Sequence, residues 1–392
     1  MTPTMADTYI ACLTPPGSAA IACLALFGPQ AWNVVRDGFR TRSRADGLLP
    51  PQPEAGKIWL GRLGDAFKDD VVVAAKRDQP MPLVEVQCHG GREVVRMLAE
   101  QFEARGVRPC SWQTFGLLVS NDRIAARAAG ALASALTVRT AAILLDQQQG
   151  AMARALEQLL LLWQEGRDRE ASLLLGGLNR WTKLGGHLTT PWRVAVCGPP
   201  NVGKSSLVNA LAGFQRSIVT EIPGTTRDVV TTLIAVDGWP VELADTAGLR
   251  EGAGALERQG MELTHRAAAE ADLCVWVLDA SRPPIWPDAP SEKTLLVVNK
   301  TDLSPAWDLA AAQTGTHVSA AAGAGLPLLC QAIAEALVPQ APMPGEPVPF
   351  TAGLCSAVNS ADRLCTERKI DMAKKVLQDA CESLGDGKSM PS

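Results

Sequence analysis

The sequence lacks the residue patterns from which zinc sites and disulfide frameworks are built. Only four of its 392 residues are histidines, and its ten cysteines are scattered without a Cys-x-x-Cys pair. No cysteine stands at a ligand-like spacing from a histidine. Scattered cysteines in a chain of this length are typical of reduced, buried thiols. We therefore expect a cytoplasmic protein without disulfides or zinc.

The chain also lacks an excess of basic charge and any long apolar run. Its net charge of −4 and pI of about 5.7 argue against a protein that coats nucleic acid by bulk electrostatics. The most apolar stretches, 131–145 and 159–163, are shorter than the roughly 18 residues of a membrane-spanning helix. The apolar start at 9–27 has no basic segment before it and contains Pro15 and Pro16, so we expect neither export nor a membrane partner.

Composition divides the chain into four zones. Residues 1–112 combine short β-like runs with a helical pattern at 93–105 and predict a small α+β domain. Residues 113–190 have helical spacing and predict the first part of a helical domain. From 191 to 340 apolar strands, glycine loops and helices alternate, as in a doubly wound α/β domain with a mixed sheet. Residues 341–392 predict a proline-rich linker and a helical return. The β-like runs of the first zone are 57–60, 70–75 and 82–87.

A complete phosphate-binding loop, G-x-x-x-x-G-K-S, occupies residues 198–205 between a predicted strand and a predicted helix. Its glycines let successive backbone N–H groups surround phosphates, and the helix N-terminus adds positive potential. Lys204 is expected to reach the β- and γ-phosphates, and the Ser205 hydroxyl to bind Mg²⁺. The residues expected to contact the nucleotide here are Asn201, Val202, Gly203, Lys204, Ser205 and Ser206.

Two further motifs follow predicted strands in the order found in GTPases. Asp245-Thr246-Ala247-Gly248 ends one strand, where Asp245 is expected to hold Mg²⁺ through water and Gly248 to contact the γ-phosphate. Asn299-Lys300-x-Asp302 ends another, and a carboxylate at Asp302 can accept both hydrogen bonds that guanine offers and adenine does not. Ser319 and Ala320 follow a third strand and are expected near the guanine O6. The sequence therefore predicts a GTP- and GDP-binding domain.

The residue after Gly248 is Leu249, where Ras-like GTPases place the glutamine that orients the attacking water. Either another residue does this work, or the domain binds GTP without hydrolysing it. We expect a hydrolase.

Several runs of residues resemble the MnmE/TrmE family of tRNA-modification GTPases. Outside the nucleotide domain, Leu-Thr-Pro-Pro-Gly at 13–17 and Cys-His-Gly-Gly at 88–91 resemble landmarks of the family's folate-binding domain. The resemblance implies a nucleotide domain inserted into a helical domain, a homodimer, and the partners tRNA and an MnmG-type flavoprotein. The runs in the nucleotide domain are Gly-Pro-Pro-Asn-Val-Gly-Lys-Ser-Ser at 198–206, Ile-Val-Thr-Glu-Ile-Pro-Gly-Thr-Thr-Arg-Asp at 218–228, Asp-Thr-Ala-Gly-Leu-Arg at 245–250 and Leu-Glu-Arg-Gln-Gly at 256–260.

The resemblance also implies catalysis with K⁺ in place of an arginine finger. Glu257 matches the family's water-orienting glutamate, which would answer the absence of glutamine at 249, and Thr226 matches its Mg²⁺-binding threonine. Judged without the resemblance, Glu257 is a solvated helix residue and Asn201 a turn residue. The positions that match the K⁺ site are Asn201, Thr220, Ile222 and Thr225.

The residues that match the family's folate site depart from the family's pattern. Glu85 matches a glutamate that contacts formyl-tetrahydrofolate, and Arg123 stands where the family has a lysine. Ala25, however, occupies the position of a folate-contacting arginine. The resemblance thus leaves formyl-tetrahydrofolate as a doubtful cofactor. His89, followed by two glycines, is expected to have a structural rather than a catalytic role.

The last residues lack the family's terminal Cys-x-Gly-Lys motif, and the helical zone is shorter than in the family. Cys381 lies outside such a motif and is expected to be a helix-face thiol. Three interpretations remain: a tRNA wobble-uridine modification GTPase, a divergent paralogue acting as a regulatory or assembly GTPase without folate chemistry, and a ribosome-assembly GTPase of the Era/Der type. The third is disfavoured because no KH-like segment or second GTPase domain is visible.

Overall fold

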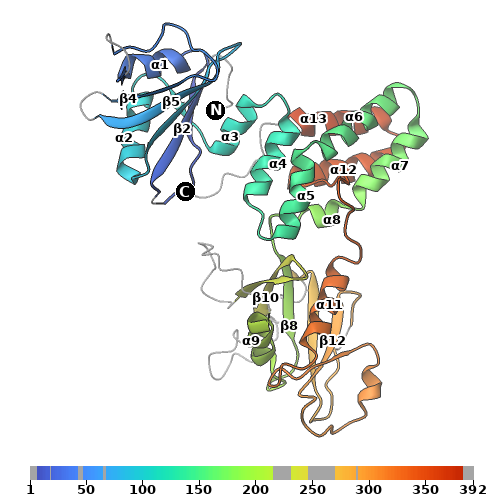
Figure 1. The fold of residues 1–392 in the computed structure, drawn as a ribbon. Helices are drawn as coiled ribbons and strands as arrows, with labels where there is room; N and C mark the ends of the chain where they lie inside the picture. Colours follow the sequence, from blue (N-terminus) through green and yellow to red (C-terminus); the bar gives the residue numbers. More distant parts are fainter. Residues whose placement is uncertain are drawn as a thin grey trace, which may run out of the picture. The chain divides into compact units, whose positions relative to one another are not determined.

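The computed structural model describes residues 7–17, 19–42, 47–64, 68–214, 231–245, 270–287 and 290–382. The chain forms two compact units, residues 1–130 together with 381–392, and residues 131–380 (Figure 1). The expected architecture is confirmed: an N-terminal α+β unit, helices, and a P-loop α/β domain within the second unit. The boundaries expected at 112, 190 and 340 stay predictions.

The first unit is built on a seven-stranded sheet with the order β3-β4-β5-β6-β2-β1-β7. All neighbouring strands are antiparallel except β1 and β7. The strands are β1 (Tyr9–Cys12), β2 (Ile21–Phe27), β3 (Phe39–Thr41), β4 (Ile58–Leu63), β5 (Asp69–Arg77), β6 (Leu83–His89) and β7 (Arg108–Pro109), and the helices are α1 (Ala31–Gly38), α2 (Arg92–Glu103), α3 (Trp112–Val119) and α4 (Arg123–Ala133).

Both faces of strand β2 are buried. Leu24 and Leu26 lie in the larger apolar core, which includes residues of α1 and α2. Ala25 and Phe27 point to the other face and pack with Phe115 of α3. The strand therefore carries apolar residues at consecutive positions instead of alternating with polar ones.

The helices of the second unit come from two distant parts of the sequence. Asn179 donates a 2.7 Å hydrogen bond to Asp362, and Thr182 donates one of 3.1 Å to Asn359. Gly185 lies so close to the returning chain that an added Cβ would stand 1.7 Å from the carbonyl oxygen of Pro349. The helices are α5 (Val138–Gln148), α6 (Ala151–Gln164), α7 (Asp168–Asn179), α8 (Thr182–Gly185), α12 (Ala352–Thr366) and α13 (Ile370–Glu382).

The α/β domain lies between these two groups of helices in the sequence. Its six-stranded sheet has the order β13-β12-β11-β8-β10-β9, and only β9 and β10 are antiparallel. Helices α9 and α11 contact each other and strand β9. The elements are β8 (Trp192–Cys197), α9 (Lys204–Phe214), β9 (Thr231–Val236), β10 (Trp239–Asp245), β11 (Leu273–Asp279), β12 (Thr294–Asn299), η2 (Leu309–Ala312), β13 (Thr316–His317) and α11 (Leu326–Leu337).

The α/β domain contacts the helices through the turn between β9 and β10. The guanidinium of Arg139, near the start of α5, lies 4.4 Å from the ring centre of Trp239 and donates a 2.6 Å hydrogen bond to the backbone oxygen of Asp237. At the start of β8, His187 stacks on Trp192 with ring centres 3.7 Å apart. The two groups fix the turn and the first strand to the helices that precede them.

Part of the proline-rich segment is buried. Val348 and Phe350 are buried, and the Val348 N–H donates a 3.1 Å hydrogen bond to the Gln147 side chain. Gln147, itself buried, also donates to the carbonyl oxygen of Glu346. Residues 346 and 348 are therefore held by a helix that is distant in sequence, while the linker expected for this segment stays a prediction.

Candidate nucleotide site

The loop between β8 and α9 has a backbone that only particular residues can adopt. Gly198 has φ +134°, and a Cβ there would stand 2.6 Å from the carbonyl oxygen of Val277. Gly203 has φ +95°, and its Cβ would stand 2.5 Å from the side-chain nitrogen of Asn299. Asn201 has φ +64°, in the left-handed region that asparagine tolerates better than most residues. The glycines are therefore required by the close approach of the neighbouring strands.

Lys204 is the first residue of α9 and is buried. Its ammonium group donates hydrogen bonds of 3.0 Å to the Gly198 oxygen and 2.8 Å to the Pro199 oxygen. The charge thus lies across the loop at a helix N-terminus, where a phosphate is favoured. Ser205 and Ser206 follow it in the helix and are exposed.

Asp245 ends strand β10 at the same edge of the sheet. It is buried and lies beside Val196 in the parallel register with β8, the strand that leads into the phosphate loop. The Ser205 hydroxyl and the Asp245 carboxylate are hard oxygen donors carried by neighbouring elements, a donor set suited to Mg²⁺. The residues present therefore fit the metal that the sequence predicts.

The guanine-binding motif is tied to the phosphate loop by Asn299. This buried side chain donates a 3.0 Å hydrogen bond to the Val202 oxygen and accepts one of 3.0 Å from the Ala320 N–H. The Ser319 hydroxyl donates a 2.6 Å hydrogen bond to one carboxylate oxygen of the exposed Asp302. The structure therefore brings together the two loops that the sequence placed at separate strand ends.

Lys300 makes a second connection, through a residue that sequence analysis missed. Its ammonium donates 2.7 Å to the Asn201 oxygen and 2.6 Å to the carboxylate of Asp279, the last residue of β11. Burial alone would raise the pKa of Asp279, but the hydrogen bonds from Lys300 and Ser281 hold that pKa below its ordinary value. A carboxylate at the end of an apolar strand was the signal that could have identified it.

Part of the predicted site lies outside the described residues. Of the positions assigned to K⁺, only Asn201 is among the described residues. The threonine expected to bind Mg²⁺ and the glutamate expected to orient the attacking water also lie outside them. So do the residues between Asp245 and the end of its motif. The predicted residues outside the described ranges are Thr220, Ile222, Thr225, Thr226, Thr246, Ala247, Gly248 and Glu257.

The residues assigned to folate lie in the first unit. Glu85 of β6 stands opposite Ala25 of β2, and Lys76 lies 3.9 Å from its carboxylate. Arg123, at the start of α4, donates to the carbonyl oxygen of Glu382. Among the described residues no hydrogen bond or ion pair joins Glu85 to Arg123. The structure therefore does not bring the two into direct contact.

His89 is held by a buried carboxylate. Its Nδ1 lies 2.6 Å from one oxygen of Asp69, and its backbone N–H donates 2.9 Å to the other. These bonds fix the end of β6, as a structural role requires. Cys381 lies within α13, where burial raises the pKa of its thiol. It is therefore the helix-face thiol that was expected.

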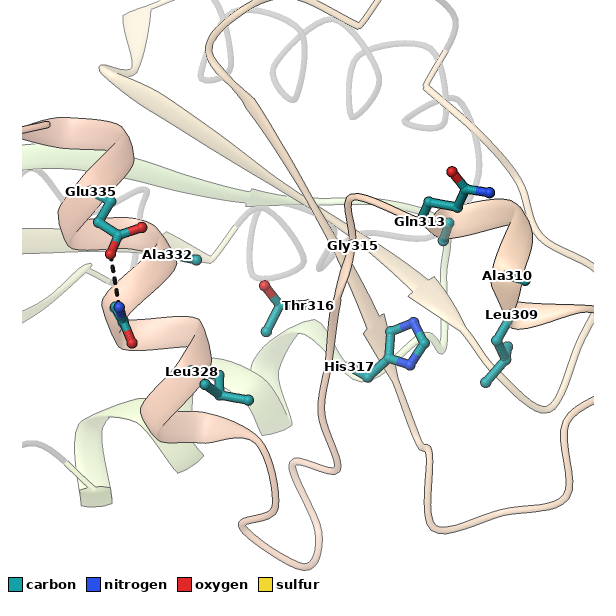
Figure 2. Close-up of a pocket in the computed structure, with 11 residues that line it drawn as sticks. Leu309, Ala310, Gln313, Gly315, Thr316, His317, Leu328, Ala332 and Glu335 are labelled. Carbon is teal, nitrogen blue, oxygen red and sulfur yellow. Dashed lines mark hydrogen bonds between the residues drawn. The ribbon is translucent and has the colours of Figure 1, made fainter.

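A surface hollow of about 610 Å³ beside the edge strand β13 does not have the chemistry of a nucleotide site (Figure 2). It lies between η2, β13 and α11, and no lysine or arginine is among its lining residues. Its one carboxylate, Glu335, accepts a hydrogen bond from Gln331 (Figure 2). In the parts of the chain that the structure describes, no group of three or more His, Cys, Asp and Glu residues could hold a metal ion. No described helix is long and apolar enough to cross a membrane.

The chain is similar to known GTPases, both in the part that holds the nucleotide site and over most of its length. A family model described as 50S ribosome-binding GTPase matches residues 193–303. The tRNA modification GTPase MnmE of Thermus thermophilus is 32% identical over 367 residues, 85% of this chain and 83% of that protein. MnmE of a Synechococcus species is 31% identical over 410 residues, 92% of this chain and 88% of that protein. Among solved structures, the G domain of the T. maritima FeoB iron transporter matches 37% of this chain and 98% of its own at 25% identity, with a TM-score of 0.28.

Proposed function

Because the chain belongs to the MnmE family of tRNA modification GTPases and is a GTP hydrolase, we propose that it couples GTP hydrolysis to tRNA modification. The observation that supports this proposal is the extent of the similarity, which covers 85% and 92% of the chain and therefore residues of both units. A ribosome-assembly GTPase of the Era/Der type would share the nucleotide domain, and the ribosome-binding GTPase model indeed matches only residues 193–303.

The test is mass spectrometry of tRNA nucleosides from a strain that lacks the gene. We expect the modified wobble uridine to disappear and the wild-type gene to restore it. Lys204→Ala is the variant to compare with the wild-type gene in this restoration test, because it removes the ammonium at the phosphate loop and leaves the first unit unchanged. Unchanged tRNA in the deletion strain would contradict the proposal. In the same strain carrying a tagged copy of the gene, affinity purification would test the proposed homodimer and the proposed MnmG-type flavoprotein partner.

In the nucleotide site, Ser205 and Asp245 would hold Mg²⁺, and Asp302 would select guanine. The metal, when bound, neutralises charge that develops on the phosphates. Lys204 would bind the phosphates, which the positive end of α9 also favours.

We propose further that K⁺ stimulates hydrolysis through Asn201. The left-handed backbone of Asn201 places this residue at the turn of the phosphate loop, and its side chain is exposed there. A fixed monovalent cation beside the phosphates supplies the charge that an arginine finger supplies elsewhere. The hydrolysis rate should therefore fall about tenfold or more when Na⁺ replaces K⁺. Equal rates in the two salts, with GTP saturating, would contradict this assignment.

A second candidate function, a GTPase switch without folate chemistry, is favoured by one observation. Ala25 replaces a ligand-binding arginine and is fully buried in an apolar cluster with Phe27 and Phe115. A lost charge-assisted hydrogen bond weakens an anionic ligand by about 1.5–3 kcal/mol. Calorimetric titration with formyl-tetrahydrofolate should accordingly show weak or no binding. Micromolar binding that Glu85→Ala abolishes would contradict this candidate.

A further inference from the structure

We propose that Asp279 is a positioning residue for nucleotide binding, which acts by holding Lys300 against the phosphate loop. The inference rests on the proposed recognition of guanine by Asp302. Asp279 belongs to none of the nucleotide motifs, yet it ends β11 beside Asn299 at the end of β12. Its carboxylate contacts Lys300 of the guanine motif, and Lys300 in turn contacts Asn201 of the phosphate loop.

The Asp279 carboxylate is buried and fully engaged. Its side chain is 4% exposed, and one oxygen lies 2.6 Å from the Lys300 ammonium. The other oxygen accepts hydrogen bonds from Ser281, 2.8 Å from its N–H and 2.7 Å from its hydroxyl. The backbone oxygen of Asp279 accepts a 2.9 Å hydrogen bond from Trp307. A buried carboxylate with this set of donors is a fixed anchor rather than a mobile group.

Lys300 transmits this anchoring to the phosphate loop. Its backbone has φ +63°, and its ammonium also donates to the Asn201 oxygen. The lysine stem passes close to Gly203, whose Cβ would stand 3.8 Å from the Lys300 Cε. Lys300 is therefore held at both of its acceptors, and the guanine motif keeps a fixed distance from the loop that binds the phosphates.

Loss of the anchor should weaken binding without altering the chemical step. With Asp279→Asn the charge-assisted contact to Lys300 is lost while the side-chain size is kept. We expect GTP and GDP to bind about ten- to a hundred-fold more weakly, with the hydrolysis rate at saturating GTP unchanged within about twofold. Asp308→Asn is the matched control, since this exposed carboxylate caps η2 and does not contact Lys300.

A double-mutant cycle with Lys300→Met distinguishes positioning from a general effect on the fold. If Asp279 acts through Lys300, the double variant should bind GTP as weakly as either single variant and no more. The double variant removes the buried carboxylate and its partly exposed partner together, so it leaves neither ion unpaired and should fold even where Asp279→Asn does not. The inference would be overturned if the losses of GTP affinity in the two single variants multiplied in the double variant. It would also be overturned if Asp279→Asn lowered the hydrolysis rate at saturating GTP.

A separate variant reports on the underlying function. Asp302→Asn should shift nucleotide preference from GTP towards xanthosine triphosphate. If that shift fails, the guanine assignment fails whatever Asp279 does. If the shift occurs and Asp279→Asn binds GTP normally, only the positioning role of Asp279 is refuted.

Discussion

Replacing Asn299 with alanine should disconnect the guanine motif from the phosphate loop. The side chain is 1% exposed and makes one hydrogen bond to each side, to the Val202 oxygen and from the Ala320 N–H. A buried polar group left without its partner costs about 1–3 kcal/mol. Two such groups give a loss of about 2–4 kcal/mol if the backbone relaxes in part. We expect the free energy of unfolding to fall by that amount, and GTP affinity to fall about ten- to a hundred-fold.

The assay combines fluorescence titration with a labelled GTP analogue and unfolding in urea. Asn179→Ala is the matched control, because Asn179 makes a comparable partly buried hydrogen bond to Asp362 among the helices. That variant should lose stability while it keeps GTP affinity. If Asn299→Ala keeps wild-type affinity as well, the link between the two loops is not what organises the site.

Three other outcomes follow from the same site and its surroundings. Asp302→Asn should lose GTP affinity and gain affinity for xanthosine triphosphate, since the amide offers a donor where guanine needs an acceptor; a competition assay measures both. Gly203→Ala should lower GTP affinity and stability together, because its Cβ would stand 2.5 Å from the Asn299 amide, and normal titration and unfolding curves would contradict this. Burial alone would raise the pKa of Asp272, but the His187 imidazole 3.6 Å away and a 2.9 Å hydrogen bond from the Arg193 N–H hold it below its ordinary 3.8. The ionised Asp272 carboxylate therefore stabilises the fold fully above pH 3.8, and this stabilisation is lost as the pH falls through the lower folded pKa. Between about pH 5 and pH 2, the urea midpoint should accordingly fall less for Asp272→Asn than for the wild type.

The nucleotide loops could be predicted from the sequence because their chemistry restricts the residues allowed. Gly198 and Gly203 occupy backbone conformations and close contacts that other residues do not tolerate, and Lys204 carries the required charge. Asp279 escaped prediction because a single carboxylate after an apolar strand has no motif around it. Its place at the same sheet edge as Asn299 becomes evident only when β11 and β12 are aligned in register.

The other misses arose where burial hid the usual signals. Strand β2 has apolar residues on both faces, so the period of two that marks a half-buried strand is absent. Residues 9–27 therefore read only as an apolar run. In the proline-rich segment, Val348 and Phe350 are buried although prolines near them favoured a linker. The Val348 N–H donates a hydrogen bond to Gln147, which is distant in sequence, so no local pattern could indicate this contact.

Because Gly185 and Pro349 are in contact, the two points where the chain enters and leaves the nucleotide domain lie close together in space. The chain leaves the helices and returns to them at one point, where two backbones touch without an intervening side chain. Ends that lie this close allow a domain to be inserted or removed with little change in loop-closure entropy. A short glycine-rich bridge across that point should leave the hydrogen bonds of Asn179 and Thr182 to α12 in place. The same proximity means that the packing among the helices does not depend on the length of chain inserted between Gly185 and Pro349.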